Sequence, residues 1–162
     1  MQKEFMHNKI KPVIVLLLMQ LSFVTFSKAQ KIVGATWSFS VEQKDDKEAT
    51  LVITATIKET FHIYSQFLTT NDGPIPTTFD FTKNKNFELI GKVEEGKAEE
   101  INDEAFQMKL LIFEKTAEFK QKIKILSKEN FNVEGKLTFM ACDNRMCLPP
   151  EDVPFSFSIN KK

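Results

Sequence analysis

The two cysteines of the chain, Cys142 and Cys147, are separated by four residues in the stretch ACDNRMCLPPEDVPF at 141–155. The residues between them are turn-forming or of typically exposed types: Asp143, Asn144, Arg145 and Met146. Thiols at such a spacing can form a cross-link, bind a soft metal ion or exchange electrons with another thiol pair. The pair is therefore the first candidate for chemistry.

These three roles stay open on the residues alone. A bridge that closes so short a loop stabilises a fold by only about 2 kcal/mol in the chain-entropy model, so it is better suited to being opened than to stapling. Redox exchange needs a thiolate, and the loop does not decide the thiol pKa, because Arg145 favours the thiolate and Asp143 disfavours it. A cuprous ion would find soft ligands at Met140, Cys142, Met146 and Cys147, although this spacing is not specific for copper.

The strand that precedes the pair indicates how Cys142 is presented. Successive side chains of a strand point to opposite faces, so Leu137, Phe139 and Ala141 share one face, and Thr138, Met140 and Cys142 share the other. We therefore expect Cys142 to point away from the larger apolar set, on the more accessible side. The pair should sit at the mouth of a hairpin-like connection.

Residues 1–29 have the pattern of a cleaved secretory signal peptide: a basic start, an apolar middle and a small-residue end. The apolar run from Pro12 to Phe26 is 15 residues long, shorter than the roughly 18 to 20 that span a bilayer. We predict cleavage after Ala29 and an exported, periplasmic domain of residues 30–162; the alternative is an uncleaved anchor. Outside the cytoplasm a cysteine pair becomes oxidised unless something reduces it.

Composition narrows the classes of function. Removing residues 1–29 takes four lysines and one glutamate from totals of 22 basic and 22 acidic residues, which leaves a net charge near −3 and no sign of a nucleic-acid binder. His62 is the only histidine after residue 29, which removes most zinc and histidine-based chemistries. We expect one domain with no cofactor, large enough to bury a core without a disulfide.

A period of two dominates residues 30–162 and predicts half-buried antiparallel strands. In ATLVITATIK (49–58) one face carries Leu51, Ile53, Ala55 and Ile57. Similar runs occupy 35–41, 61–65, 77–81, 86–93, 106–114, 118–126, 132–141 and 153–159. About nine strands without a convincing helical stripe predict an all-β, immunoglobulin-like antiparallel sandwich.

The charged segment KVEEGKAEEINDEA, residues 92–105, is the longest polar stretch. Composition alone predicts a solvated surface loop. The functional alternative is a loop that folds over a site, with Phe106 marking the point where the loop becomes a strand.

With these motifs in order, the chain resembles the N-terminal domain of the thiol:disulfide interchange protein DsbD. The resemblance rests on FHIYSQ at 61–66, GPIPT at 73–77, NDEAF at 102–106 and ACDNRMCLPPEDVPF at 141–155, and it covers essentially all of residues 30–162. It implies an immunoglobulin-like thiol-disulfide oxidoreductase whose reduced pair attacks the disulfide of an oxidised partner. Cys147 would form the intermolecular bond and Cys142 would resolve it.

The resemblance also assigns a cap to the site. A loop carrying a phenylalanine shields the cysteines in this family, which gives Asp103, Glu104 and Phe106 a shielding role. Tyr64 falls where the family places an aromatic residue near the pair; the alternative is an ordinary core aromatic. This chain has one residue fewer between its cysteines than the family member on which the comparison rests.

The partners follow from the same resemblance. A chain without the membrane electron conduit must draw electrons from a membrane thiol reductase in another polypeptide and deliver them to thioredoxin-like periplasmic proteins, including those of cytochrome c maturation. Contact with the membrane is expected only through such partners. The alternative function is a non-enzymatic binding module with a structural disulfide or a cuprous site.

Overall fold

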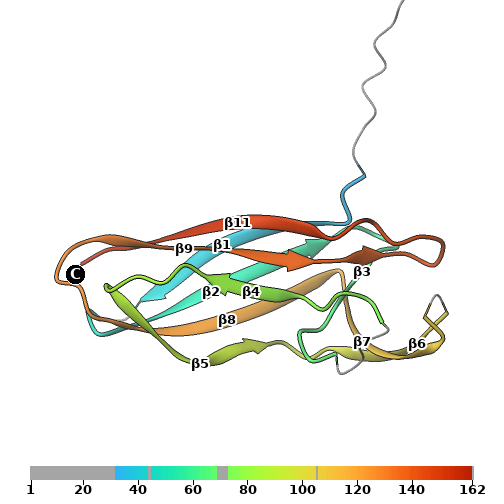
Figure 1. Ribbon diagram of the computed structural model, residues 1–162, viewed down its shortest axis with the longest axis horizontal. Coiled ribbons are helices and arrows are strands. Elements are labelled where there is room, and N and C mark those ends of the chain that lie inside the picture. Colours follow the sequence, from blue (N-terminus) through green and yellow to red (C-terminus); the bar gives the residue numbers. More distant parts are fainter. Residues whose placement is uncertain (1–31, 44, 69–72, 105, 162) are drawn as a thin grey trace, which may run out of the picture. The chain divides into compact units, whose positions relative to one another are not determined.

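Figure 1 shows the computed structural model, which describes residues 32–43, 45–68, 73–104 and 106–161. Over these ranges the secondary structure consists of β-strands: β1 (Ala35–Gln43), β2 (Glu48–Ile57), β3 (His62–Tyr64), β4 (Thr78–Phe81), β5 (Phe87–Glu95), β6 (Glu99–Asp103), β7 (Met108–Glu114), β8 (Thr116–Ile125), β9 (Phe131–Phe139), β10 (Ala141–Cys142) and β11 (Glu151–Ile159). No helix within them is long and apolar enough to cross a membrane. The predicted signal peptide, residues 1–29, lies outside the described residues and stays a prediction.

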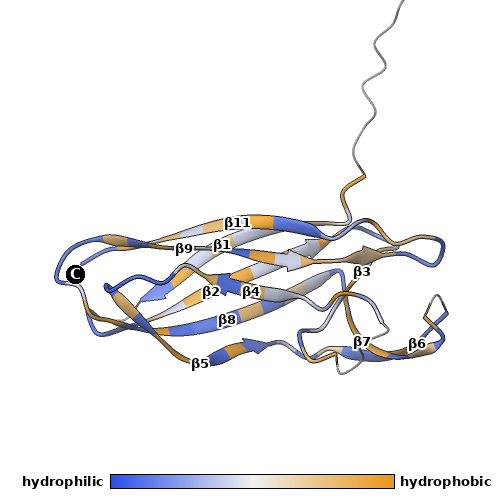
Figure 2. Ribbon diagram, viewed as in Figure 1, coloured by the Kyte–Doolittle hydropathy of each residue, from blue (hydrophilic) through white to orange (hydrophobic). Residues whose placement is uncertain are grey.

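Two sheets enclose the main core. One has the strand order β1-β2-β8-β5 and the other the order β11-β9-β4, and the pairs within both are antiparallel. Figure 2 shows hydrophobic and hydrophilic residues interleaved along these strands, which is the period of two seen in the sequence. The predicted inward face of β2 is confirmed, because Leu51, Ile53, Ala55 and Ile57 are all buried in the core.

Aromatic side chains join the two sheets across this core. Phe39 of β1 packs against Phe155 and Phe157 of β11, with ring centroids 5.9 Å and 5.7 Å apart. Phe79 of β4 lies 5.0 Å from Phe119 of β8. Aromatic rings bury large apolar areas, so these contacts carry much of the stability of a small sandwich.

Gly135 lies in the middle of β9, where the chain leaves no room for a side chain. A Cβ atom built there would lie 2.2 Å from the carbonyl oxygen of Asp80 on β4 and 2.5 Å from the ring of Phe155 on β11. Because Gly135 has no side chain, the ring of Phe155 can lie over it, and β4, β9 and β11 can approach closely.

The third sheet has the order β10-β3-β7-β6 and carries Cys142 at the end of β10. One of its faces joins the main core through Ile63, Phe113 and Ala141, which are buried there. The opposite face carries a separate, smaller cluster of Tyr64, Leu110, Ile112 and Cys142. Because neighbouring residues of a strand alternate between faces, β3 serves both clusters.

The prediction of an all-β, immunoglobulin-like antiparallel sandwich is confirmed. The nine predicted runs correspond to strands of the structure, which has two further short strands, β6 and β10. The prediction that residues 92–105 form a loop was wrong for most of the segment. β5 continues to Glu95 and β6 occupies Glu99–Asp103, where pairing with β7 offsets the poor strand propensity of EEIND.

Candidate functional site

The cysteines close a tight turn between β10 and the segment before β11. Cys142 and Cys147 form an isolated antiparallel bridge, their sulfurs are bonded at 2.03 Å, and their Cα atoms are 4.0 Å apart. The Asp143 carboxylate accepts hydrogen bonds from the backbone N–H groups of Arg145 and Met146, each at 2.8 Å. These two bonds hold the pKa of Asp143 below its usual value. The hairpin-like connection predicted from the sequence is confirmed.

The two cysteines differ in their exposure. Cys142 retains 1% of its accessible surface, whereas Cys147 is partly exposed and follows Met146, which is 47% exposed. The expectation that Cys142 lies on an accessible side was therefore wrong. Its side chain does point away from the main core, as the alternation predicts, but the smaller cluster of Tyr64, Leu110 and Ile112 covers that second face.

Across the sheet, Cys142 pairs with His62 of β3, and His62 pairs in turn with Glu114 of β7. Residues directly opposite each other in an antiparallel pair place their side chains on the same face. The alternation along β3 brings Tyr64 to this face as well. The buried side of the disulfide is therefore bordered by an imidazole and a phenol.

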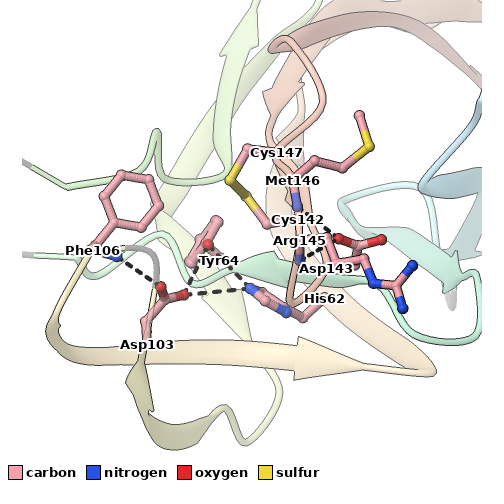
Figure 3. The surroundings of a disulfide bond; sticks show 9 residues. All are labelled: His62, Tyr64, Asp103, Phe106, Cys142, Asp143, Arg145, Met146 and Cys147. Atoms are coloured by element: carbon pink, nitrogen blue, oxygen red, sulfur yellow. Dashed lines mark hydrogen bonds and ion pairs between the residues drawn. A yellow bond between two sulfur atoms is a disulfide. The ribbon is translucent and has the colours of Figure 1, made fainter.

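One carboxylate connects these rings to the loop between β6 and β7. The hydroxyl of Tyr64 donates to Asp103 Oδ2 at 3.1 Å, and His62 Nε2 lies 3.0 Å from the same hydroxyl oxygen and 3.6 Å from Asp103 Oδ2. The other oxygen, Oδ1, accepts the backbone N–H of Phe106 at 3.0 Å. Figure 3 shows this chain of contacts running from His62 to the loop.

Burial shifts the protonation of both rings toward the neutral state. Removal from water lowers the pKa of His62, and the nearby carboxylates of Asp103, Glu114 and Asp143 oppose this only in part. Removal from water also raises the pKa of Tyr64, reinforced by the negative charge of Asp103. At neutral pH the site therefore holds a neutral imidazole and a neutral phenol.

The disulfide is half buried and bordered by a loop with an aromatic residue. A family model matches the chain that carries it. Residues 29–158 match the model described as the thiol:disulfide interchange protein DsbD, N-terminal. The chain belongs to this family. No curated protein sequence gives a significant match.

Two solved structures, a DsbD N-terminal domain and a ScsB domain, share the fold of this DsbD N-terminal family member. The N-terminal domain of Neisseria meningitidis DsbD in the reduced form is 18% identical, with a TM-score of 0.53, over 76% of this chain and 86% of that one. The N-terminal periplasmic domain of ScsB from Proteus mirabilis is 11% identical, with a TM-score of 0.57; the match covers 83% of this chain and 49% of that chain. A complex of the DsbD and PilB N-terminal domains from N. meningitidis gives a TM-score of 0.47.

The structure places the predicted cap residues of this family member around one loop. Phe106 is partly buried, packs against the smaller cluster and meets the ring of Tyr64 edge-on, with ring centroids 6.3 Å apart. Asp103 is buried at the start of the loop, and Glu104 is exposed. Cys147 packs against the same cluster as Phe106. Of the predicted set, Glu104 alone has an exposed side chain.

Three of the four soft ligands proposed for copper, Met140, Cys142 and Cys147, lie in or contact the smaller cluster, and Met146 does not. The sulfurs of Cys142 and Cys147 are bonded to each other, and the side chain of Met146 extends away from them in Figure 3. Within the described residues there is also no group of three or more His, Cys, Asp or Glu side chains arranged for a metal.

Sequence reasoning set His62 aside as a lone histidine, yet the structure places it at the site. The signal was present in FHIYSQ, because alternation puts His62 and Tyr64 on one face of a strand. What the sequence did not reveal is that β10 pairs with β3 and brings Cys142 opposite the histidine.

Proposed function

We propose that this chain is a periplasmic thiol-disulfide interchange module that relays reducing equivalents between protein partners through a reversible Cys142–Cys147 disulfide. The observation that carries the proposal is the unequal exposure of the two cysteines across a turn of four residues. A relay needs one sulfur that a partner can reach and a second, protected sulfur that releases the partner. A purely structural bridge needs neither.

The exchange has two balanced steps. In the reduced protein, the Cys147 thiolate attacks a partner's disulfide, one partner sulfur leaves as a thiolate, and a mixed disulfide forms. Cys142, as a thiolate, then attacks the Cys147 sulfur, and the second partner sulfur leaves. Two electrons pass to the partner, which ends reduced, while this chain ends with the Cys142–Cys147 disulfide. A second partner, a dithiol reductase, returns it to the reduced state by the reverse steps.

The β6–β7 loop supplies protection between these encounters. Phe106 packs on the cluster that holds Cys142, and Asp103 fixes the loop through the N–H of Phe106 and the hydroxyl of Tyr64. A covered pair meets fewer unsuitable thiols. In this proposal Asp103, Phe106 and Tyr64 act as shielding residues, and the exposed Glu104 lies where an approaching partner would contact the loop.

The proposed partners are thioredoxin-like periplasmic proteins on the accepting side and a membrane thiol reductase in another polypeptide on the donating side. Membership of the DsbD N-terminal family supports this assignment, and the periplasmic origin of the ScsB domain supports the location. The signal-peptide pattern of residues 1–29 is consistent with export.

The decisive experiment is an equilibrium titration of the purified protein against graded ratios of reduced and oxidised dithiothreitol, with free thiols as the readout. Structural disulfides typically have potentials below about −300 mV, whereas relay pairs titrate above this value. We expect reversible titration above that limit with the fold intact. A bridge that is reduced only when the sandwich unfolds would contradict the relay and favour the stapled binding module.

Partner trapping provides an independent test. Cys142→Ala leaves Cys147 without its resolving sulfur, so mixed disulfides with partners should accumulate and be visible on a non-reducing gel of envelope extracts. Cys147→Ala is the matched control, because it leaves only the buried Cys142. Equal trapping by both variants would contradict the assignment of Cys147 as the attacking residue.

A further inference from the structure

The release step of the proposed relay poses a problem for Cys142 that the partly exposed Cys147 does not share. Cys142 must lose its proton before it attacks the mixed disulfide, but it retains only 1% of its surface and lies among Tyr64, Leu110 and Ile112. Apolar surroundings do not stabilise a charged thiolate, and bulk water does not reach this sulfur freely to accept the proton. A neighbouring group that accepts the proton would remove this obstacle.

His62 is the titratable side chain directly opposite Cys142. The two residues are register partners in the β10–β3 ladder, so their Cβ atoms lie about 4.5–5.5 Å apart on the same face of the sheet. His62 is itself buried, with 6% of its surface exposed. Its side chain therefore leaves the same face of the sheet as that of Cys142, and its ring contacts Tyr64 and Asp103 there.

The hydrogen bonds of the site determine which nitrogen is available. The single hydroxyl proton of Tyr64 is donated to Asp103, so toward His62 the phenol oxygen can only accept. Nε2 of His62 therefore carries the proton, and in the neutral ring Nδ1 is left with its lone pair. No described residue donates a hydrogen bond to Nδ1, which leaves this nitrogen able to accept a proton.

We propose that His62 is the proton acceptor for Cys142 in the resolution step. This inference rests on the proposed relay function. The Cys142 S–H proton passes to the imidazole ring of His62, and the thiolate attacks the Cys147 sulfur of the mixed disulfide. The Cys142–Cys147 bond forms, the bond to the partner breaks, and the departing partner thiolate takes up the proton from the imidazolium. When a reductase opens the disulfide, the same ring protonates the leaving Cys142.

The groups around His62 suit this transient charge. Tyr64 on its own strand and Asp103 at the end of β6 contact the ring. Glu114, its register partner on β7, and Asp143 in the cysteine turn add negative charge nearby. Burial keeps the resting imidazole neutral by lowering its pKa, so it is ready to accept a proton at neutral pH. The three carboxylates then stabilise the imidazolium while it exists.

The test follows the two steps separately in the full chain. The reduced protein is mixed with the aromatic disulfide dithiobis(nitrobenzoate), which releases one coloured thiolate when Cys147 attacks and a second when Cys142 resolves the mixed disulfide. Cys142→Ala should release only the first. The rate of the second release is then measured as a function of pH in the unsubstituted protein and in His62→Gln, whose amide can still donate to Tyr64 but accepts no proton.

We expect the unsubstituted protein to resolve at a rate that is flat through the neutral range and falls only below pH 6.5, where His62 becomes protonated. His62→Gln should resolve about 100-fold more slowly at neutral pH, the lower end of what a positioned base contributes. Its rate should rise tenfold per pH unit and approach that of the unsubstituted protein in alkali, where hydroxide removes the proton. The first release should be unchanged.

A matched variant tests whether the fall of the rate in acid comes from protonation of His62. Glu114→Gln removes a negative charge near His62 but keeps the base, so resolution should stay fast while its fall begins at a lower pH. Unimpaired resolution in His62→Gln at neutral pH, or the same slowing at every pH, would overturn the proposal.

If His62→Gln does not fold, the profile of the unsubstituted protein decides alone, because a tenfold rise per pH unit through neutrality excludes the imidazole. If both thiolates are released and neither rate depends on His62, only the role of His62 is contradicted and the relay stands. A pair that stays oxidised until the fold melts overturns the relay itself, and the role of His62 with it.

Discussion

The hydroxyl of Tyr64 donates a hydrogen bond at 3.1 Å to Oδ2 of Asp103, a residue 39 positions later in the chain. This contact ties β3, which runs beside the cysteines, to the end of β6. The second oxygen of Asp103 sets the conformation of the loop through the N–H of Phe106. One buried carboxylate thus links the position of the loop to the sheet that carries the disulfide.

Replacing this carboxylate should loosen the loop and lower stability. Asp103→Ala leaves the buried hydroxyl of Tyr64 without its acceptor, which should reduce the free energy of unfolding by about 1–3 kcal/mol. Asp103→Asn keeps one acceptor oxygen and should lose less. Urea denaturation measures both, and the rate of disulfide reduction by dithiothreitol should rise in the same order. Unchanged stability in Asp103→Ala would show that the hydrogen bond does not stabilise the fold.

The cysteine turn should depend on the ionised state of Asp143. Its lowered pKa means that folding favours the carboxylate, so this contribution is present above the ordinary value of 3.8 and is lost as pH falls through the lowered value. Asp143→Ala should remove the acid-sensitive contribution and increase exchange of the Arg145 and Met146 amides, measured by NMR. Asp143→Asn retains an acceptor and should protect both amides at every pH. Equal exchange in the two variants would mean that the turn holds without this side chain.

Gly135 should not tolerate even a methyl group. Gly135→Ala places a Cβ against Asp80 and Phe155, and the forced shift of strands should reduce the free energy of unfolding by about 1–3 kcal/mol. Gly96→Ala is the matched control, because the contact nearest to its Cβ is the Glu118 carbonyl at 3.7 Å. Urea denaturation should separate the two variants clearly; similar midpoints would contradict the close approach of β4 and β9.

His62 should make the stability of the fold sensitive to mild acid. Its folded pKa lies below the unfolded value of 6.5, so the unfolded chain binds the proton more readily. Stability is therefore full above pH 6.5 and declines as pH falls through the folded pKa. His62→Gln should abolish this decline, as measured by urea midpoints across the range. A midpoint that falls equally in both proteins would assign the acid sensitivity to other groups.

Much of the fold follows from the sequence because the main strands bury one face each. The alternation of Leu51, Ile53 and Ala55 survives in the structure because every second residue of β2 meets the core between two sheets. The same reasoning failed for β6, since EEIND has the composition of a loop and becomes a strand only by pairing with β7. Pairing between distant segments is not encoded in local propensity.

The candidate site was predictable in its residues but not in its arrangement. The spacing of the cysteines and the resemblance to a family pointed to Cys142, Cys147, Tyr64 and Phe106. The burial of Cys142 was missed because alternation gives the face of a side chain but not what covers that face. His62 was set aside for the same reason, since its neighbour across the sheet comes from residue 142.

The bridge between Cys142 and Cys147 spans a sequence separation of only five, entirely within one turn. A thermodynamic cycle relates the stability of the fold to the reduction of the disulfide. The oxidised and reduced proteins differ in their free energy of unfolding by the same amount as the folded and unfolded chains differ in their free energy of disulfide reduction. For so short a loop the chain-entropy contribution is about 2 kcal/mol, small beside the roughly 5–15 kcal/mol that holds a domain together. Substitutions in the sandwich core therefore destabilise both redox forms alike. The reduction potential of the cysteine pair is then set by the residues around the pair.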